Sequence, residues 1–105
     1  LAYKPFRGNY WVYDDSYSNV AVYGYLYDWS TAKEVCPAGW HLPSDAEWTE
    51  LVNYLGGETV AGGKMKATSG WNNDGNGTNS SGFSALPGGY RYYNGTFINK
   101  KNILL

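Results

Sequence analysis

Residues 42–57 constrain the fold most tightly, because they carry the start, the apolar face and the end of one helix. Ser44 and Glu47 form an S-x-x-E capping box, in which each side chain satisfies a free backbone N–H of the other residue. The apolar side chains that follow recur at i, i+3, i+4 and i+7 and so share one face: Trp48, Leu51, Val52 and Leu55. Gly56 and Gly57 end this helix, since glycine adopts the left-handed conformation without a steric penalty.

The elements before this helix are shorter, because glycine, asparagine and serine interrupt the chain often. β-Branched and aromatic residues between turn signals predict short strands at 10–13 and 20–27. Asp28 or Ser30 then begins a helix of about two turns that runs through Val35 and stops at the following proline.

The second half of the chain reads as one irregular turn, a loop and a hairpin. Two glycines limit residues 58–65 to a single turn, and the polar, glycine-rich residues 70–82 form a loop. Residues 90–93 and 96–98 flank Asn94-Gly95, which predicts a type I′ hairpin. Residues 1–105 therefore predict a single α+β domain with two short helices, a small twisted antiparallel sheet and long loops.

The composition favours aromatic over ionic contacts. Charged residues make up 16% and aromatic residues 18% of the chain, and the formal net charge is -1. No basic cluster exceeds the pair Lys100-Lys101, so the electrostatic signature of nucleic-acid binding is missing. No apolar run approaches the roughly 18 residues of a membrane span.

The chain offers little catalytic chemistry. His41 is the only histidine, and a buried ring hydrogen-bonded to backbone is the commoner arrangement for a residue before a helix start. A general base needs a nucleophile and an orienting group beside it. The motifs of zinc, serine-hydrolase, dinucleotide and phosphate sites are absent from the sequence. We therefore expect a protein that is not an enzyme.

A calcium site is one interpretation of the long loop. Asn73, Asp74 and Asn76 place side-chain oxygens at near-alternate positions, as a Ca²⁺ loop requires. Only one of the three is a carboxylate and no closing Glu follows, which predicts weak binding. The alternative, which we favour, is a turn-rich loop whose side chains bond their own backbone. We expect no cofactor, with calcium left open.

Aromatic rings beside amides are also typical of surfaces that bind sugars. The candidate ligand-binding residues are Trp71, Asn73, Asp74, Asn76 and Asn79 in the loop, with Arg91 and Tyr93 on the hairpin. Alternation along the strand places Tyr90 and Tyr92 on one face, and Arg91 and Tyr93 on the other. The alternative is that many of the aromatic side chains fill a small core.

Three stretches resemble a known family: residues 23–29 (YGYLYDW), 36–48 (CPAGWHLPSDAEW) and 82–91 (GFSALPGGYR). They are similar to the Fibrobacter succinogenes major paralogous domain, and the likeness runs to about Phe97. The resemblance implies a C-type-lectin-like fold, shared with formylglycine-generating-enzyme-like domains. It also implies a place in surface or secreted bacterial proteins, which are often lipoproteins.

The resemblance carries further expectations. In the family, Cys36 is expected to pair with a Cys in a last strand that this sequence lacks, so here it is expected to be a free thiol. The terminal strands are expected to be incomplete, which leaves Phe97 and Ile98 exposed at an edge and favours self-association. Residues expected to stabilise the fold, the two tryptophans by packing, are Cys36, Trp40, Ser44, Glu47 and Trp48.

These observations together predict an extracellular binding or adhesion module at a bacterial surface. Its partner is expected to be a glycan or a surface protein, contacted through residues 71–79 and the hairpin at 90–93. One alternative is a structural domain of a surface appendage or cell-wall assembly. The other is a degenerate formylglycine-generating-type enzyme, which a single Cys disfavours.

Overall fold

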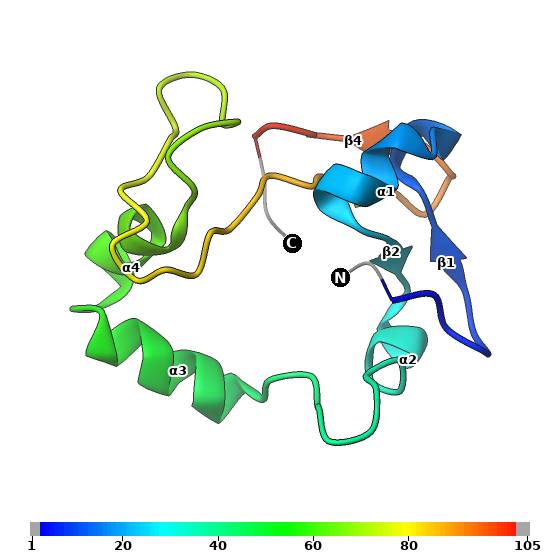
Figure 1. Cartoon of the computed structure of the whole chain (residues 1–105), viewed down its shortest axis with the longest axis horizontal. Helices are drawn as coiled ribbons and strands as arrows, with labels where there is room; N and C mark the ends of the chain where they lie inside the picture. The colour runs from blue at the N-terminus through cyan, green and yellow to red at the C-terminus, as the bar shows by residue number, and fades with distance from the viewer. Residues whose placement is uncertain (1–2, 103–105) are drawn as a thin grey trace.

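Short helices and two small antiparallel sheets make up an α+β fold in the computed structural model, which describes residues 3–102 (Figure 1). In chain order the elements are β1 (Tyr10–Trp11), a 3₁₀ turn (Tyr13–Asp15), α1 (Ser18–Tyr23), β2 (Leu26–Tyr27), α2 (Trp29–Ala32), α3 (Asp45–Tyr54), α4 (Glu58–Met65), β3 (Tyr90–Arg91) and β4 (Phe97–Ile98). The α+β class is confirmed. The expected two helices and one sheet are wrong, since the described chain has four α-helices and two sheets.

The elements fall into two groups. Strand β1 pairs with β2, with Tyr10 opposite Tyr27, and β3 pairs with β4, with Tyr90 opposite Ile98. Helices α3 and α4 pack against each other on one side of the molecule, and the sheets lie with α1 and α2 on the other side (Figure 1). Among residues 3–102, no helix combines the length and apolar character that crossing a bilayer requires.

The starts of both helices that the sequence predicts are confirmed, because their start signals are local. The first helix ends at Ala32 after one turn, so the two turns expected through Val35 are wrong. The Asp28 carboxylate accepts the Thr31 N–H at 2.9 Å and caps α2. At α3, the Glu47 N–H donates to Ser44 Oγ and the Ser44 N–H donates to Glu47 Oε2, each at 3.2 Å. Leu55, at the end of the predicted apolar face, is buried.

The strand expected at 20–27 is wrong over its first half. Residues Ser18–Tyr23 form the helical turn α1, and only Leu26 and Tyr27 are extended. The valines of this segment favour a strand, but tertiary contacts outweigh such propensities. Asn19 holds the turn in place, because its Nδ2 donates to the Tyr13 carbonyl at 2.9 Å.

The single turn expected at 58–65 is wrong as well, because these residues form the two-turn helix α4. Each internal glycine costs a helix up to about 1 kcal/mol relative to alanine. Ala61 is buried against neighbouring residues, and Lys64 Nζ donates to the Leu55 carbonyl at 2.7 Å. These contacts offset the cost, so α4 depends on α3 rather than on its own propensity.

Replacing Gly62 with alanine is therefore expected to stabilise the protein. A Cβ at this position meets nothing within 4 Å, so only the helix propensity changes. The free energy of unfolding should rise by about 0.5–1 kcal/mol in urea denaturation. The contrasting variant is Gly77→Ala, whose Cβ would lie 2.4 Å from the Gly63 carbonyl oxygen and should destabilise. A loss of stability in Gly62→Ala would mean that α4 is not a helix at this residue.

The hairpin is confirmed, but its turn type is not. A type I′ turn needs positive φ at both central residues, and here Gly95 has φ 92° while Asn94 does not have positive φ. The Gly95 N–H donates to the Tyr92 carbonyl at 2.9 Å, and the Tyr92 N–H donates to the Thr96 carbonyl at 2.7 Å. The connection is thus a three-residue loop with glycine in the left-handed region, the next most common hairpin geometry.

Little of the aromatic content is buried. The buried apolar side chains of the described chain are Pro5, Val12, Tyr13, Val35, Leu55, Ala61, Ala85 and Pro87. Trp40 is 77% exposed, so its expected packing role is wrong, and Trp48 is 38% exposed with its ring 6.0 Å from that of Phe83. Phe97 and Ile98 are half-buried rather than exposed. The aromatic side chains of this chain therefore lie mostly at its surface.

Candidate functional site

Three of the predicted loop residues hold the loop together. The Trp71 N–H donates to Asn76 Oδ1 at 2.9 Å, and Trp71 Nε1 donates to the Ala85 carbonyl at 3.2 Å. Asn79 Oδ1 accepts from the Ser84 N–H at 2.7 Å, and its Nδ2 donates to Ser84 Oγ at 2.8 Å. These contacts match the turn-rich interpretation of the loop.

The remaining two loop candidates, Asn73 and Asp74, are exposed. Both adopt left-handed backbone, with φ 54° and 56°, which Asn and Asp tolerate better than other residues. Asn76 already uses its side-chain oxygen within the loop. A calcium site at residues 73–76 stays a prediction, and it rests on Asn73 and Asp74 alone.

The hairpin candidates lie on a different surface. Arg91 Cζ lies 4.5 Å from the centroid of the Trp11 ring and 6.0 Å from that of Phe97, so Arg91 joins the two sheets. Tyr93 is exposed, and its ring centroid lies 4.5 Å from that of Tyr92. Figure 1 shows the yellow-green loop and the hairpin that ends in β4 at opposite sides of the molecule. The two halves of the predicted site are therefore separate.

A cleft beside β1 was not predicted. It has a volume of about 370 Å³, and we call it the aromatic cleft; its lining residues are Tyr10, Trp11, Val12, Asp15 and Tyr17. Trp11 connects the cleft to Arg91 of the hairpin. The Tyr10 ring packs edge-on against Tyr25, with 5.3 Å between the ring centroids.

A cation and a left-handed turn lie beside the aromatic cleft. Lys4 Nζ lies 5.8 Å from the Tyr10 ring centroid, and a hydrogen bond to Tyr10 raises the pKa of Lys4. Asp14 and Asp15 are consecutive left-handed residues, with φ 53° and 54°. Such strain recurs at ligand sites, where the surrounding structure holds it. The sequence signal for this turn is the Asp14-Asp15 pair, since Asp tolerates positive φ.

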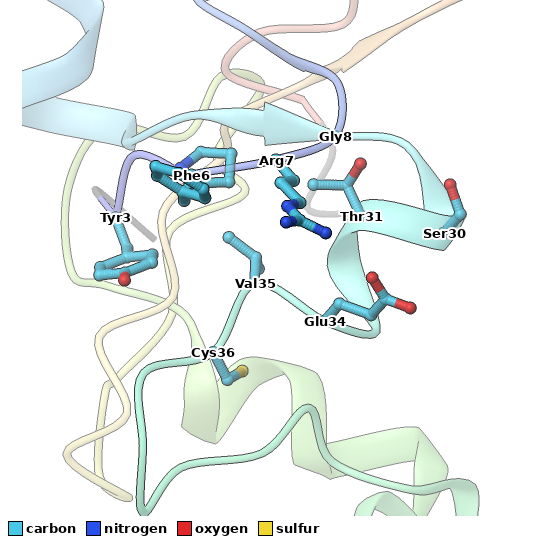
Figure 2. Close-up of a pocket in the computed structure, with 10 residues that line it drawn as sticks. Tyr3, Phe6, Arg7, Gly8, Ser30, Thr31, Glu34, Val35 and Cys36 are labelled. Atoms are coloured by element: carbon cyan, nitrogen blue, oxygen red, sulfur yellow. The ribbon is translucent and has the colours of Figure 1, made fainter.

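A second hollow, the N-terminal cavity, lies between residues 3–8 and the end of α2 (Figure 2). Its volume is about 300 Å³, and its charged lining residues are Arg7 and Glu34. Cys36 also lines it, is half-buried and is a free thiol in the described chain. The sequence alone gave no reason to bring Arg7 and Glu34 together.

His41 is not buried, contrary to the expectation. Its side chain is 73% exposed, and Nε2 lies 2.9 Å from both carboxylate oxygens of Glu47. Hydrogen bonds from His41 and from the Ser44 N–H lower the pKa of Glu47. His41 therefore supports the cap of α3, and its contacts are those of a structural residue.

The comparison with family models decides the family. The model of the Fibrobacter succinogenes major domain matches residues 3–104. The chain belongs to this family. The comparisons with curated proteins and with solved structures gave no match. The region that defines this Fibrobacter succinogenes major domain includes the loop, the hairpin, the aromatic cleft and the N-terminal cavity.

Proposed function

We propose that this Fibrobacter succinogenes major domain is a non-enzymatic binding module at a bacterial surface, of C-type-lectin-like kind, and that its ligand is a glycan. The observation that carries the proposal is the aromatic cleft, in which three aromatic rings and one carboxylate line a single hollow. Arg91, one of the residues predicted for ligand contact, stacks on the wall of this cleft.

The chemistry of the cleft suits a sugar. The ring of Tyr17 offers a flat apolar face for the C–H groups of a pyranose, and the hydroxyls of Tyr10 and Tyr17 donate and accept hydrogen bonds. The Asp15 carboxylate accepts hydrogen bonds from sugar hydroxyls, and such charge-assisted bonds are the stronger kind. The volume of about 370 Å³ lies in the range of small-molecule sites, about 300–1,000 Å³.

The charges around the cleft argue against a cationic ligand. Lys4 lies over the Tyr10 ring and Arg91 over the Trp11 ring, so protein cations already occupy two of the ring systems. A ligand with many hydroxyls or with a negative charge finds hydrogen-bond donors at Lys4 and Arg91 and one acceptor at Asp15. A neutral or acidic glycan is therefore the class that fits.

A protein partner is the second candidate. Large aromatic side chains outside the cleft are exposed, among them Trp40 and Tyr54, and each sheet of the described chain has only two strands. Unpaired strand edges and exposed aromatic rings are typical of protein contacts, including contacts with a second copy. Adhesion, appendage assembly and self-association all belong to this second candidate.

The glycan proposal is tested with a panel of neutral and acidic oligosaccharides by NMR titration of the labelled chain, with and without calcium. Tyr17→Ala and Asp15→Asn should each lower the affinity for the glycan about tenfold. This is the loss expected from removing one stacked ring or one strong hydrogen bond. Tyr17 is 74% exposed, and Asn tolerates the left-handed backbone at residue 15, so neither change should unfold the chain.

The matched control is Tyr54→Ala on α3, which removes an equally exposed Tyr, 86% accessible, outside the cleft. It should leave the affinity unchanged. If no glycan of the panel moves the amide signals of the cleft, or if Tyr54→Ala lowers the affinity as much as Tyr17→Ala, the protein partner becomes the better candidate. Loss of calcium-dependent binding in Asp74→Ala would instead place the ligand at the loop.

A further inference from the structure

The N-terminal cavity holds two opposite charges that do not neutralise each other. Figure 2 shows the Arg7 guanidinium turned into the cavity from one wall, with Glu34 on the wall formed by the turn after α2. Among residues 3–102, the one ion pair joins His41 and Glu47, so neither Arg7 nor Glu34 has a charged partner there. The Arg7 guanidinium lies over the Phe6 ring, with 5.9 Å from Cζ to the ring centroid.

Hydrogen bonds fix the wall of the N-terminal cavity that residues 7–9 form against α2. The Asn9 N–H donates to Thr31 Oγ1 at 2.8 Å, and Asn9 Nδ2 donates to Asp28 Oδ2 at 2.8 Å. Gly8 has φ +90°, and a Cβ there would lie 2.3 Å from Thr31 Oγ1. Thr31 itself is only 5% exposed. Residues 7–9 are thus pressed onto α2, which holds the backbone of Arg7 at a set position relative to Glu34.

The same network uses the Asp28 carboxylate at the start of α2. Hydrogen bonds from Thr31 and Asn9 lower the pKa of its carboxyl group and occupy both of its oxygens. Its charge is therefore committed to the start of α2. The guanidinium of Arg7 keeps its planar set of donors, which matches a carboxylate in a two-point contact.

The remaining lining is mixed, because Ser30 and Cys36 lie beside apolar side chains and Phe6 is 94% exposed. Tyr3, Pro5, Phe6 and Val35 line the cavity together with the methyl side of Thr31 (Figure 2). The volume of about 300 Å³ is at the lower end for small-molecule sites. A ligand that fits has a negative group for Arg7, a positive group for Glu34 and a small apolar body.

We propose that the N-terminal cavity binds a free apolar α-amino acid as its zwitterion. The α-carboxylate contacts the Arg7 guanidinium, the α-ammonium contacts the Glu34 carboxylate, and the side chain packs against Phe6 and Val35. This proposal is independent of glycan binding, because the N-terminal cavity and the aromatic cleft have no lining residue in common.

The test is a calorimetric and NMR titration of the full chain with L-leucine, N-acetyl-L-leucine and L-leucinamide. The acetyl compound lacks the ammonium and the amide lacks the carboxylate, while the apolar body stays the same. L-Leucine should bind, and each capped compound should bind at least about tenfold more weakly, because one charge-assisted contact is lost. Shifted amide signals should include those of residues 7–9 and 34–36.

Two variants test which residue contacts each charged group of L-leucine. Arg7→Gln and Glu34→Gln should each lower the affinity for L-leucine at least about tenfold. The matched controls are Lys33→Gln and Glu50→Gln, which remove one cation and one anion outside the cavity and should leave the affinity unchanged. The amide signals of α3 report that each variant is still folded.

Three results would overturn the proposal. The first is no binding of L-leucine at millimolar concentration by a chain whose spectrum is folded. The second is equal affinity for L-leucine and N-acetyl-L-leucine, which would indicate a site for carboxylates in general. The third is an unchanged affinity in Glu34→Gln, since the ammonium would then have no partner in the cavity.

Discussion

Replacing Gly89 with alanine should cost about 2–5 kcal/mol of the free energy of unfolding, the sum of a left-handed backbone and an overpacked core. Gly89 has φ +68°, and a Cβ there would lie 2.6 Å from the Ile98 carbonyl oxygen and 2.7 Å from Tyr13 Cε2. A small domain has a total stability of about 5–15 kcal/mol, so this loss is a large share of it. Urea denaturation followed by circular dichroism measures it.

The neighbouring glycine provides the control for this prediction. A Cβ at Gly88 would lie 3.8 Å from the Cβ of Tyr23, which is ordinary contact, and its φ is not in the left-handed region. Gly88→Ala should therefore change the free energy of unfolding by less than about 1 kcal/mol. Equal losses in the two variants would show that the hairpin does not pack against Tyr13 at this point.

Truncation of Tyr13 to alanine is expected to cost about 3–5 kcal/mol, the usual loss for removing a buried aromatic ring. Tyr13 is buried, and its ring centroid lies 5.4 Å from that of Phe97. Its hydroxyl accepts the Lys100 N–H at 3.3 Å, and Lys100 Nζ lies 5.1 Å from the ring centroid. Tyr13 thus connects the N-terminal segment with the last strand of the described chain.

The conservative variant separates the ring from the hydroxyl. Tyr13→Phe keeps the ring and removes one long hydrogen bond, so it should cost only about 0.5–1.5 kcal/mol. The free energies of unfolding of both variants come from the same urea titrations. If Tyr13→Phe were as destabilising as Tyr13→Ala, the hydroxyl rather than the packed ring would be the main contribution, against the contacts described above.

Local signals account for the parts of the fold that the sequence predicts well. The caps at Asp28 and Ser44 lie within three residues of the N–H groups that they bind, so the starts of α2 and α3 are readable directly. The hairpin is predicted from the sequence for the same reason, because its turn signal lies directly between the two strands that it connects. The helix α1 is not, because its valines favour a strand and the bond from Asn19 to the Tyr13 carbonyl reaches outside the segment.

The candidate sites were harder to predict than the fold, because they combine distant segments. Arg91 was chosen from its strand, but its contact with Trp11 joins residues from opposite ends of the chain. The cavity around Arg7 depends on the bonds of Asn9 to α2, which no pattern of residue types indicates. The side-chain amides of Asn76 and Asn79 form hydrogen bonds with neighbouring residues of the chain. Composition alone does not distinguish amides that make such internal bonds from amides that contact a ligand.

The contact between Tyr13 and Lys100 spans 87 residues of the sequence. Closing a loop of that length costs chain entropy before any contact compensates for it, and such long-range contacts slow folding. During synthesis from the N-terminus, β1 and the residues of the aromatic cleft leave the ribosome long before the hairpin that supports them. The residues that line the cleft all lie within 10–17, so they are synthesised well before Arg91, which stacks on Trp11 in the folded chain.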